Sequence, residues 1–365
     1  MLTIPDQTDI ITSLPENHSA RSVTERKGLL IKSRTAARRS YSPYSGFPVG
    51  AAIRTWRGTE HMGQNTETAI SEGLNCGERS AILDAVTQGE HFHRRDFLQM
   101  IAISCINAPP PYTQTLGSKN GKHIETAVDL AVQEQEKQPQ TNFAGLTPGW
   151  LKNKFVLQAL SDGSPCGACR QVMNDFSGSN TIVLIDDHKD GVLFRMSDLL
   201  PVGFRFGDTT QQDKPHIENV YHIEQQAHSN QISLIDAANL AAHNSYSWGT
   251  AHLKNGTAIR CTDGQIYIGS SMINSSTGLS INSMRSAVNR AISNGAIERC
   301  GTTFIQDIAT SFTEKKHPLC IQHGIAQDLM IEFANQATII NIRIENEISR
   351  FSIGQLLSIP HRTPQ

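Results

Sequence analysis

The sequence predicts an α/β fold with a mixed sheet that occurs twice along the chain. Segments of strand and helix character alternate from residue 25 to residue 207, which is typical of an α/β sandwich. The second half then repeats the first without gaps at an offset of 206 residues, because "AIRTWRGTEHMG" from Ala52 falls on "AIRCTDGQIYIG" from Ala258. In the same register "RSAI" at 79–82 falls on "RSAV" at 285–288. The length of 365 residues agrees with two units, because one domain usually holds roughly 100 to 200 residues.

The elements of the first unit follow from local patterns. Small and apolar residues at helical spacing predict helices in "ERKGLLIKSRTAARRSY", in residues 75–86 and in "CGACRQVMNDF". Apolar and β-branched runs predict strands in "VGAAIRTWRG", "TEHMGQN", "FLQMIAISCIN" and "NTIVLID". Residues 108–162, before the third helix, are polar and rich in Gln, Pro, Thr and Lys. So long a segment is expected to be an insertion rather than core.

The same patterns divide the chain into domains. Residues 1–24 are expected to be a loose leader, residues 25–207 a domain that carries the chemistry, and residues 208–231 a polar linker. Residues 232–365 would form the second copy. In the repeat register Cys76 falls on Asn282 and Glu78 on Met284, so this copy is expected to be non-catalytic. Cys320 and His323 in "CIQH" form a pair with no third ligand nearby, which makes a second metal site a weak alternative.

Composition and charge limit the function classes. Hydrophobic residues make up 38% and charged residues 18%, an ordinary globular composition. The formal net charge of -2 disfavours nucleic acid as the main partner. No signal peptide and no run of about eighteen apolar residues is evident, so we expect a cytoplasmic protein with no membrane partner. Seven cysteines, an odd number, then indicate reduced thiols that are available to a metal.

Two distant motifs, "NCGERSAI" and "SPCGACRQVM", carry the candidate chemistry. Cys76, Cys166 and Cys169 can supply three thiolates to one Zn2+, which favours tetrahedral sulfur ligands and leaves a fourth position open for water. Glu78, two residues after Cys76, would then stand beside that open position. A carboxylate there can take a proton from the water and pass it to a leaving group. A closed structural zinc site, and Glu78 as a mere helix-start charge, remain the alternatives.

Arg79 can offset the surplus negative charge of a three-thiolate metal site. Three thiolates around one divalent ion carry a net charge of -1, which makes the bound water less acidic than histidine ligands would. An arginine beside Glu78 can hydrogen-bond the thiolates and withdraw charge. The alternative is an exposed helix arginine, and it gains weight because the counterpart Arg285 persists in the half without the cysteines.

The residues resemble a known family, the zinc-dependent cytidine deaminases. "SYSPYSGFPVGAAI", "GQNTETA", "NCGERSAI" and "SPCGACRQVM" are similar to four blocks of that family and occur in the same order between residues 40 and 176. The resemblance implies a three-layer α/β/α domain with a mixed sheet, here duplicated. It also implies hydrolytic deamination, in which a zinc-activated water attacks C4 of cytosine while a glutamate shuttles protons.

The resemblance further implies a substrate site. Asn65 and Glu67 would hydrogen-bond the sugar hydroxyls, and Phe47 would pack against the base. The main chain of Gly77 and the carbonyl of Ser164 would contact the pyrimidine edge. Polar groups committed to hydroxyls favour a nucleoside over a bare base, because a ligand without hydroxyls leaves them unpaired. The alternatives are that Phe47 belongs to the core and that Glu67 is a solvated surface carboxylate.

These inferences predict a deaminase of cytidine and deoxycytidine that serves pyrimidine salvage, with one Zn2+ per chain and a homodimeric state. One departure is that two-domain family members commonly use one histidine and two cysteines, whereas this chain has three cysteines. Three other functions stay open: deamination of a modified cytosine nucleoside such as a nucleoside antibiotic, a non-enzymatic zinc-bearing scaffold, and the less favoured editing of a polynucleotide.

Overall fold

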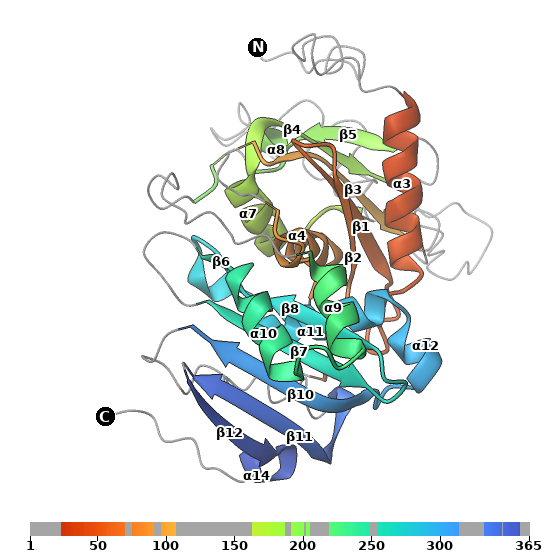
Figure 1. The fold of residues 1–365 in the computed structure, drawn as a ribbon. Coiled ribbons are helices and arrows are strands. Elements are labelled where there is room, and N and C mark those ends of the chain that lie inside the picture. Colours follow the sequence, from red (N-terminus) through yellow and green to blue (C-terminus); the bar gives the residue numbers. More distant parts are fainter. Residues whose placement is uncertain are drawn as a thin grey trace, which may run out of the picture.

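The computed structural model describes most of the two predicted units. The described residues are 23–69, 75–90, 96–106, 163–186, 191–200, 202–204, 219–247, 254–313, 332–344 and 346–357. The described residues do not include the expected insertion at 108–162, nearly all of the expected leader, Cys320 or His323. Two mixed sheets with helices on both faces make up the described part, which confirms the predicted α/β class (Figure 1).

The first sheet has the strand order β2-β1-β3-β4-β5. β3 and β4 are parallel, and the other neighbours are antiparallel. The strands are β1 Val49–Thr55, β2 Glu60–Gln64, β3 Leu98–Cys105, β4 Ser177–Ile185 and β5 Val192–Arg195. The helices are α3 Val23–Ala37, α4 Gly77–Thr87, α7 Gly167–Phe176 and α8 Met196–Leu199. Each predicted strand and helix of this unit is therefore present, with ends within a few residues of the prediction.

Two apolar clusters show that the first unit has three layers. On one face, Leu29 and Leu30 of α3 pack with Met100 and Leu184 of the sheet. On the other face, a larger cluster joins the sheet to α4, α7 and α8. Burial of apolar area on both faces of a sheet is the main force that holds such layers together.

The second sheet repeats the first in order and direction, as β8-β7-β10-β11-β12 with β10 and β11 parallel. Its strands are β7 Asn255–Cys261, β8 Ile266–Ser270, β10 Ile305–Phe312, β11 Ala334–Ile344 and β12 Glu347–Ser352. The helices are α9 Val220–His228, α10 Leu234–His243, α11 Ser283–Ser293, α12 Ala296–Cys300 and α14 Ile353–Leu357. Two short strands, β6 Tyr246–Ser247 and β9 Met272–Ile273, and a 3-10 turn at Thr277–Leu279 complete it. The domain bounds themselves stay a prediction, and α9 lies in the segment expected to be a linker.

The two units pack through α4 and α11, which lie between the sheets (Figure 1). Thr87 Oγ1 and Ser286 Oγ are 2.8 Å apart, and Arg290 Nη1 donates to Asp84 Oδ1 at 2.6 Å. Each unit also contributes one tyrosine to the packing of the other unit. Tyr246 belongs to the core cluster of the first unit, and Tyr41 packs against that of the second.

Candidate metal centre

Three thiols from distant segments meet at the start of two helices. Cys76 is the N-cap of α4, Cys166 is the N-cap of α7, and Cys169 lies in the first turn of α7. Their Sγ atoms all lie within 4.8 Å of one another. The cysteines predicted from "NCGERSAI" and "SPCGACRQVM" are therefore brought together. In the described part of the chain this group holds these three side chains and no fourth His, Cys, Asp or Glu.

The donor set fits a soft divalent metal. Helix N-termini stabilise thiolates, and the Cys169 amide donates to Cys166 Sγ at 3.4 Å. Hydrogen bonds from the Cys169 and Cys76 thiols lower the pKa of Cys166, and the same contacts raise the pKa of its two neighbours. Three cysteine sulfurs at this separation are suited to Zn2+, with a fourth position left for a non-protein ligand.

Glu78 lies directly beside the thiols. It belongs to the first turn of α4 and is 4% exposed, and its Oε2 accepts from Cys169 Sγ at 3.5 Å. Burial raises the pKa of Glu78 above the ordinary value of a glutamate. A carboxyl group with a raised pKa is easier to protonate than one in water. This property suits a general acid and base.

Arg79 contacts the thiol group from the next position of α4. Its Nη2 donates to Cys76 Sγ at 3.7 Å. A guanidinium at this place withdraws negative charge from the sulfurs. The prediction that Arg79 hydrogen-bonds the thiolates agrees with this contact. Arg285, its counterpart on α11, is buried and carries an electrostatic interaction with Cys76 as well.

A backbone pairing places the segment that holds Asn65 and Glu67 beside the segment that leads to Cys76. Thr66 and Asn75 exchange two N–H···O bonds of 2.9 Å, so the residues that flank Thr66 lie beside the residue before Cys76. Both side chains are buried. The alternative that Glu67 is a solvated surface carboxylate does not agree with this burial.

Both side chains hold the loop that joins α3 to β1. Asn65 Oδ1 accepts from Val49 N at 2.7 Å, and its Nδ2 donates to the Phe47 carbonyl at 2.9 Å. Glu67 Oε2 accepts from Tyr44 N at 3.1 Å and from Ser45 N at 2.9 Å. The sequence does not predict these bonds inside the protein. The short distance in sequence between "SYSPYSGFP" and these two residues does not indicate such bonds.

The other predicted contact residues are Phe47, Gly77 and Ser164. Phe47 is 36% exposed, which does not agree with a place in the core. Gly77 lies against the start of β1, where an added Cβ would come within 3.3 Å of the Val49 carbonyl oxygen. Ser164 is partly buried just before Cys166, and its Oγ accepts from Arg170 Nη2 at 2.5 Å. Gly77 and Ser164 are therefore neighbours of the thiol residues in the sequence, whereas Phe47 lies in the loop that leads into β1.

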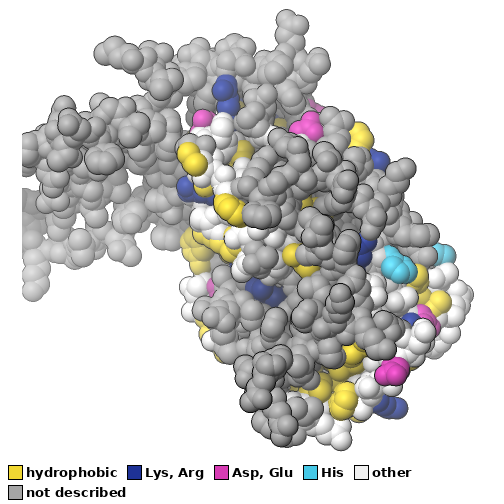
Figure 2. All heavy atoms as spheres, turned by 90° about the vertical axis from the view of Figure 1, so that its left-hand side faces the viewer, with side chains coloured by type: hydrophobic (Ala, Val, Ile, Leu, Met, Phe, Trp, Pro, Cys, Tyr) yellow, Lys and Arg dark blue, Asp and Glu magenta, His cyan; other side chains and the backbone are white. Residues whose placement is uncertain are grey.

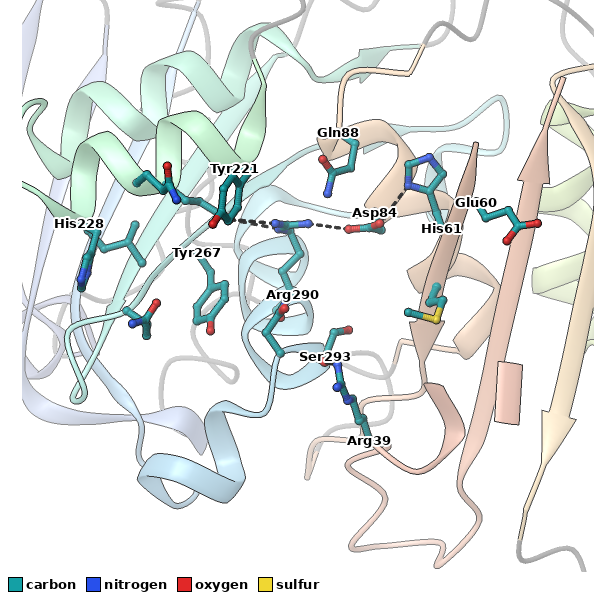
Figure 3. A pocket seen from close by; sticks show the side chains of 16 residues that line it. Arg39, Glu60, His61, Asp84, Gln88, Tyr221, His228, Tyr267, Arg290 and Ser293 are labelled. Atoms are coloured by element: carbon teal, nitrogen blue, oxygen red, sulfur yellow. Dashed lines mark hydrogen bonds and ion pairs between the residues drawn. The ribbon is translucent and has the colours of Figure 1, made fainter. Parts of the chain in front are cut away.

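A separate cavity of about 540 Å³ lies between the two units and contains none of the thiol residues (Figure 3). Its centre is an ion network in which Arg290 pairs with Asp84 and with Glu224 at 3.0 Å, and Asp84 accepts from His61 Nδ1 at 3.1 Å. Every charged group of this network has an opposite charge beside it. The cavity is therefore an interface feature and does not replace the thiol centre as the candidate site.

On the face shown in Figure 2, described Lys and Arg side chains lie singly among apolar and neutral ones and form no basic stripe. Among the described helices, none is both long and apolar enough to cross a bilayer.

Comparisons with known proteins give one consistent result. A cytidine deaminase of Sporosarcina psychrophila is 43% identical over 61 residues, which are 17% of this chain and 45% of that protein. A cytidine deaminase of Halalkalibacterium halodurans is 26% identical over 182 residues, which are 49% of this chain and 95% of that protein. No family model matches the chain.

The solved structures that match this chain are also cytidine deaminases, and their structural similarity to it is low. The cytidine deaminase of Burkholderia pseudomallei has a TM-score of 0.31 and 26% identity, over 49% of this chain and 98% of that one. The enzyme of Mycobacterium tuberculosis has a TM-score of 0.29 and 21% identity, over 49% and 97%. TM-scores this low support no conclusion about this chain.

Proposed function

We propose, from its homology to the cytidine deaminases, that this chain is a zinc-dependent hydrolytic deaminase of cytidine and deoxycytidine. The observation that carries the proposal is the meeting of three thiols with a buried glutamate, at 3.5 Å between Glu78 Oε2 and Cys169 Sγ. A pyrimidine salvage role in the cytoplasm and a homodimeric state would follow from that activity and belong to the same proposal.

In this proposal the thiol group of Cys76, Cys166 and Cys169 holds Zn2+, which supplies activation of the attacking water when it is bound. Glu78 takes a proton from that water while oxygen adds to C4 of the cytosine ring. It would give this proton to N3 of the ring and then carry the proton of the new C4 hydroxyl to the amino group, so that the C4–N bond breaks, the C4 carbonyl forms and ammonia leaves. The high pKa that burial gives Glu78 suits both steps. Arg79 offsets the surplus negative charge of three thiolates.

The pocket residues would then select a nucleoside. Phe47 would contact the base, the main chain at Gly77 and Ser164 the pyrimidine edge, and Asn65 and Glu67 the sugar hydroxyls. Asn65 and Glu67 already hold the loop before β1, so they would also set the position of Phe47. This second task supports a preformed site, which lowers the entropy cost of binding.

The variant Glu78→Gln tests the proton role. We expect Zn2+ content near one per chain and a loss of about 10²–10⁴ in kcat, because an amide of the same shape cannot accept and return the proton. The readouts are metal analysis and the fall in cytidine absorbance. The control is Cys166→Ala, which should lose the metal as well as the turnover. A Glu78→Gln enzyme that works at a near-native rate would contradict the assignment.

Three other functions remain as candidates from the sequence. A modified cytosine nucleoside would be preferred if such analogues turn over faster than cytidine in the same assay. A non-enzymatic scaffold is the answer if protein with a full Zn2+ complement leaves cytidine unchanged. Release of ammonia from single-stranded nucleic acid, but not from free nucleoside, would instead favour editing of a polynucleotide.

A further inference from the structure

The loop between α3 and β1, residues 40–48, is held from two sides. From its own unit, Glu67 accepts from the backbone N–H groups of Tyr44 and Ser45, and also from the Ser45 hydroxyl. Asn65 closes the same loop at its end through the Phe47 carbonyl. Four hydrogen bonds from two side chains leave this short loop little freedom, although Tyr44 and Phe47 are among its exposed residues.

From the other side the anchor is Glu332, which belongs to the second unit. The hydroxyl of Tyr44 donates to Glu332 Oε1 at 2.9 Å, and the hydroxyl of Tyr41 donates to the same oxygen at 3.1 Å. The Tyr41 ring also packs edge-on against Phe333, with 5.3 Å between ring centroids. A carboxylate that accepts two hydroxyl donors forms stronger hydrogen bonds than a neutral acceptor does.

Charge at this contact is favourable over the physiological range. Burial and the Glu332 carboxylate raise the pKa of Tyr41 to about 12. The hydrogen bond to Glu332 also raises the pKa of Tyr44. Both phenols therefore stay neutral donors at neutral pH.

The same type of contact occurs on the opposite side of the pseudo-symmetric pair. Asp175 and Phe176 precede β4 as Glu332 and Phe333 precede β11. There Asp175 Oδ1 accepts from Ser275 Oγ at 2.7 Å, and Phe176 packs against Tyr246 at 4.9 Å. The acid and phenylalanine before the fourth strand thus serve as a docking pair in both units.

Both contacts reach elements of the thiol centre, because Asp175 and Phe176 end α7, the helix that Cys166 caps, and Glu332 holds the loop before β1. The loop held by Glu332 continues into β1 at Val49, and the start of β1 lies against Gly77, the residue between Cys76 and Glu78. We propose that Glu332 is a positioning residue, which fixes Phe47 beside the metal centre through Tyr44 and Tyr41. The unit without thiols would in this way take part in substrate binding. The substrate part of this inference rests on the proposed function.

The test uses the full chain with Zn2+ bound and the variants Glu332→Ala, Glu332→Gln and Tyr44→Phe. Two measurements are made: steady-state kinetics with cytidine, and hydrogen exchange of the backbone amides of Tyr44 and Ser45. Glu347→Ala, a change of an exposed glutamate on β12, is the control.

We expect Glu332→Ala to raise KM by about tenfold, with kcat within about twofold and metal content unchanged, because two charge-assisted hydrogen bonds are lost. Glu332→Gln should restore most of the KM, since its amide oxygen still accepts. Tyr44→Phe, an exposed site with little risk to folding, should give an intermediate KM. The two amides should exchange faster in Glu332→Ala than in Glu347→Ala.

The outcomes separate the two proposals. Unchanged KM and unchanged exchange in Glu332→Ala overturn the positioning role while leaving deamination intact. Faster exchange in an enzyme without any cytidine turnover supports the loop anchor and overturns the proposed function. Equal loss of kcat and metal in Glu332→Ala and Glu332→Gln would mark Glu332 as part of general folding and would also overturn the positioning role.

Discussion

At the scale of single residues, Asn65 combines two tasks that the sequence presents as one. The resemblance assigns it to a sugar hydroxyl, whereas its amide oxygen and nitrogen both bond the backbone of the loop before β1. A buried amide with both ends satisfied contributes to stability as well as to shape, because each lost partner leaves a desolvated group. In the proposed function, substrate contact at this residue would be coupled to folding.

The variant Asn65→Asp separates the two ends of that amide. The carboxylate still accepts from Val49 N, but it faces the Phe47 carbonyl with an acceptor where a donor stood. We expect a loss of about 1–3 kcal/mol in the free energy of unfolding, measured with urea on Zn2+-loaded protein. The matched control is Asn219→Asp, because Asn219 caps α9 only through its oxygen and an aspartate does this equally well. Equal stability of Asn65→Asp and wild type would refute the structural task.

The residues of the site differ in how well the sequence predicts them. The three cysteines and Glu78 stand in short motifs whose spacing selects metal chemistry, so the amino-acid sequence alone is enough to predict them. Glu332 carries no such motif, because its contact with Tyr44 depends on how two units dock. Its position before Phe333, equivalent to Asp175 before Phe176, becomes visible only when both units are seen together.

At the scale of elements, the repeat extends to the distances between helix and strand. An added Cβ at Gly63 of β2 would lie 2.1 Å from the Ala81 nitrogen of α4. At Gly269 of β8, the equivalent position, it would lie 2.2 Å from the Ala287 nitrogen of α11. Backbone atoms cannot give way as a flexible side chain can. The close approach of α4, which carries Glu78, therefore depends on glycine at this place.

Gly63→Ala is expected to destabilise the fold by about 1–3 kcal/mol or more, because the new methyl group forces α4 away from the sheet. Gly269→Ala should have a similar effect through α11. Gly28→Ala, in α3 with open space around its Cβ, is the control and should stabilise by up to about 1 kcal/mol. Thermal unfolding of the three variants measures this. A Gly63→Ala protein as stable as Gly28→Ala would contradict the close packing.

One element shows why a composition argument fails locally. Residues 208–231 are polar as a whole, which predicts a linker, but Val220–His228 is the helix α9. Three buried apolar residues, Val220, Ile223 and Ala227, recur at helical spacing within the polar segment. That stripe is enough to pack α9 on the second unit, with Asn219 as its N-cap.

At the scale of the whole molecule, the two units are equivalent in fold but complementary in charge. Asp84 and Arg290 occupy the same position of α4 and α11 in the repeat register, and they form an ion pair of 2.6 Å between the units. Two identical units would place like charges opposite each other here, which is unfavourable at such a distance. Glu224 of α9 pairs with Arg290, and His61 of β2 completes the network (Figure 3).

His61 makes the stability of this interface depend on pH. Burial alone would lower the pKa of His61, but hydrogen bonds to Asp84 and Glu90 outweigh it and raise the pKa to about 9. The unfolded chain keeps a histidine pKa of about 6.5. A raised native pKa contributes stability that is complete below about pH 6.5 and is lost as the pH rises through about 9.

We therefore expect the free energy of unfolding to fall by up to about 3 kcal/mol between pH 6.5 and pH 9.5 as the His61 proton leaves the network. Urea unfolding of the full chain at these two pH values measures the change. Other groups also titrate in this range, so the comparison is with His61→Gln, which keeps a polar side chain but cannot be charged. Only the difference between the two proteins reports on His61. The assignment requires wild type to lose clearly more stability than His61→Gln over this interval, because Asp84 and Glu90 both lose the His61 cation, and Asp84 keeps Arg290. Parallel curves for the two proteins would show that the interface does not depend on a charged imidazole.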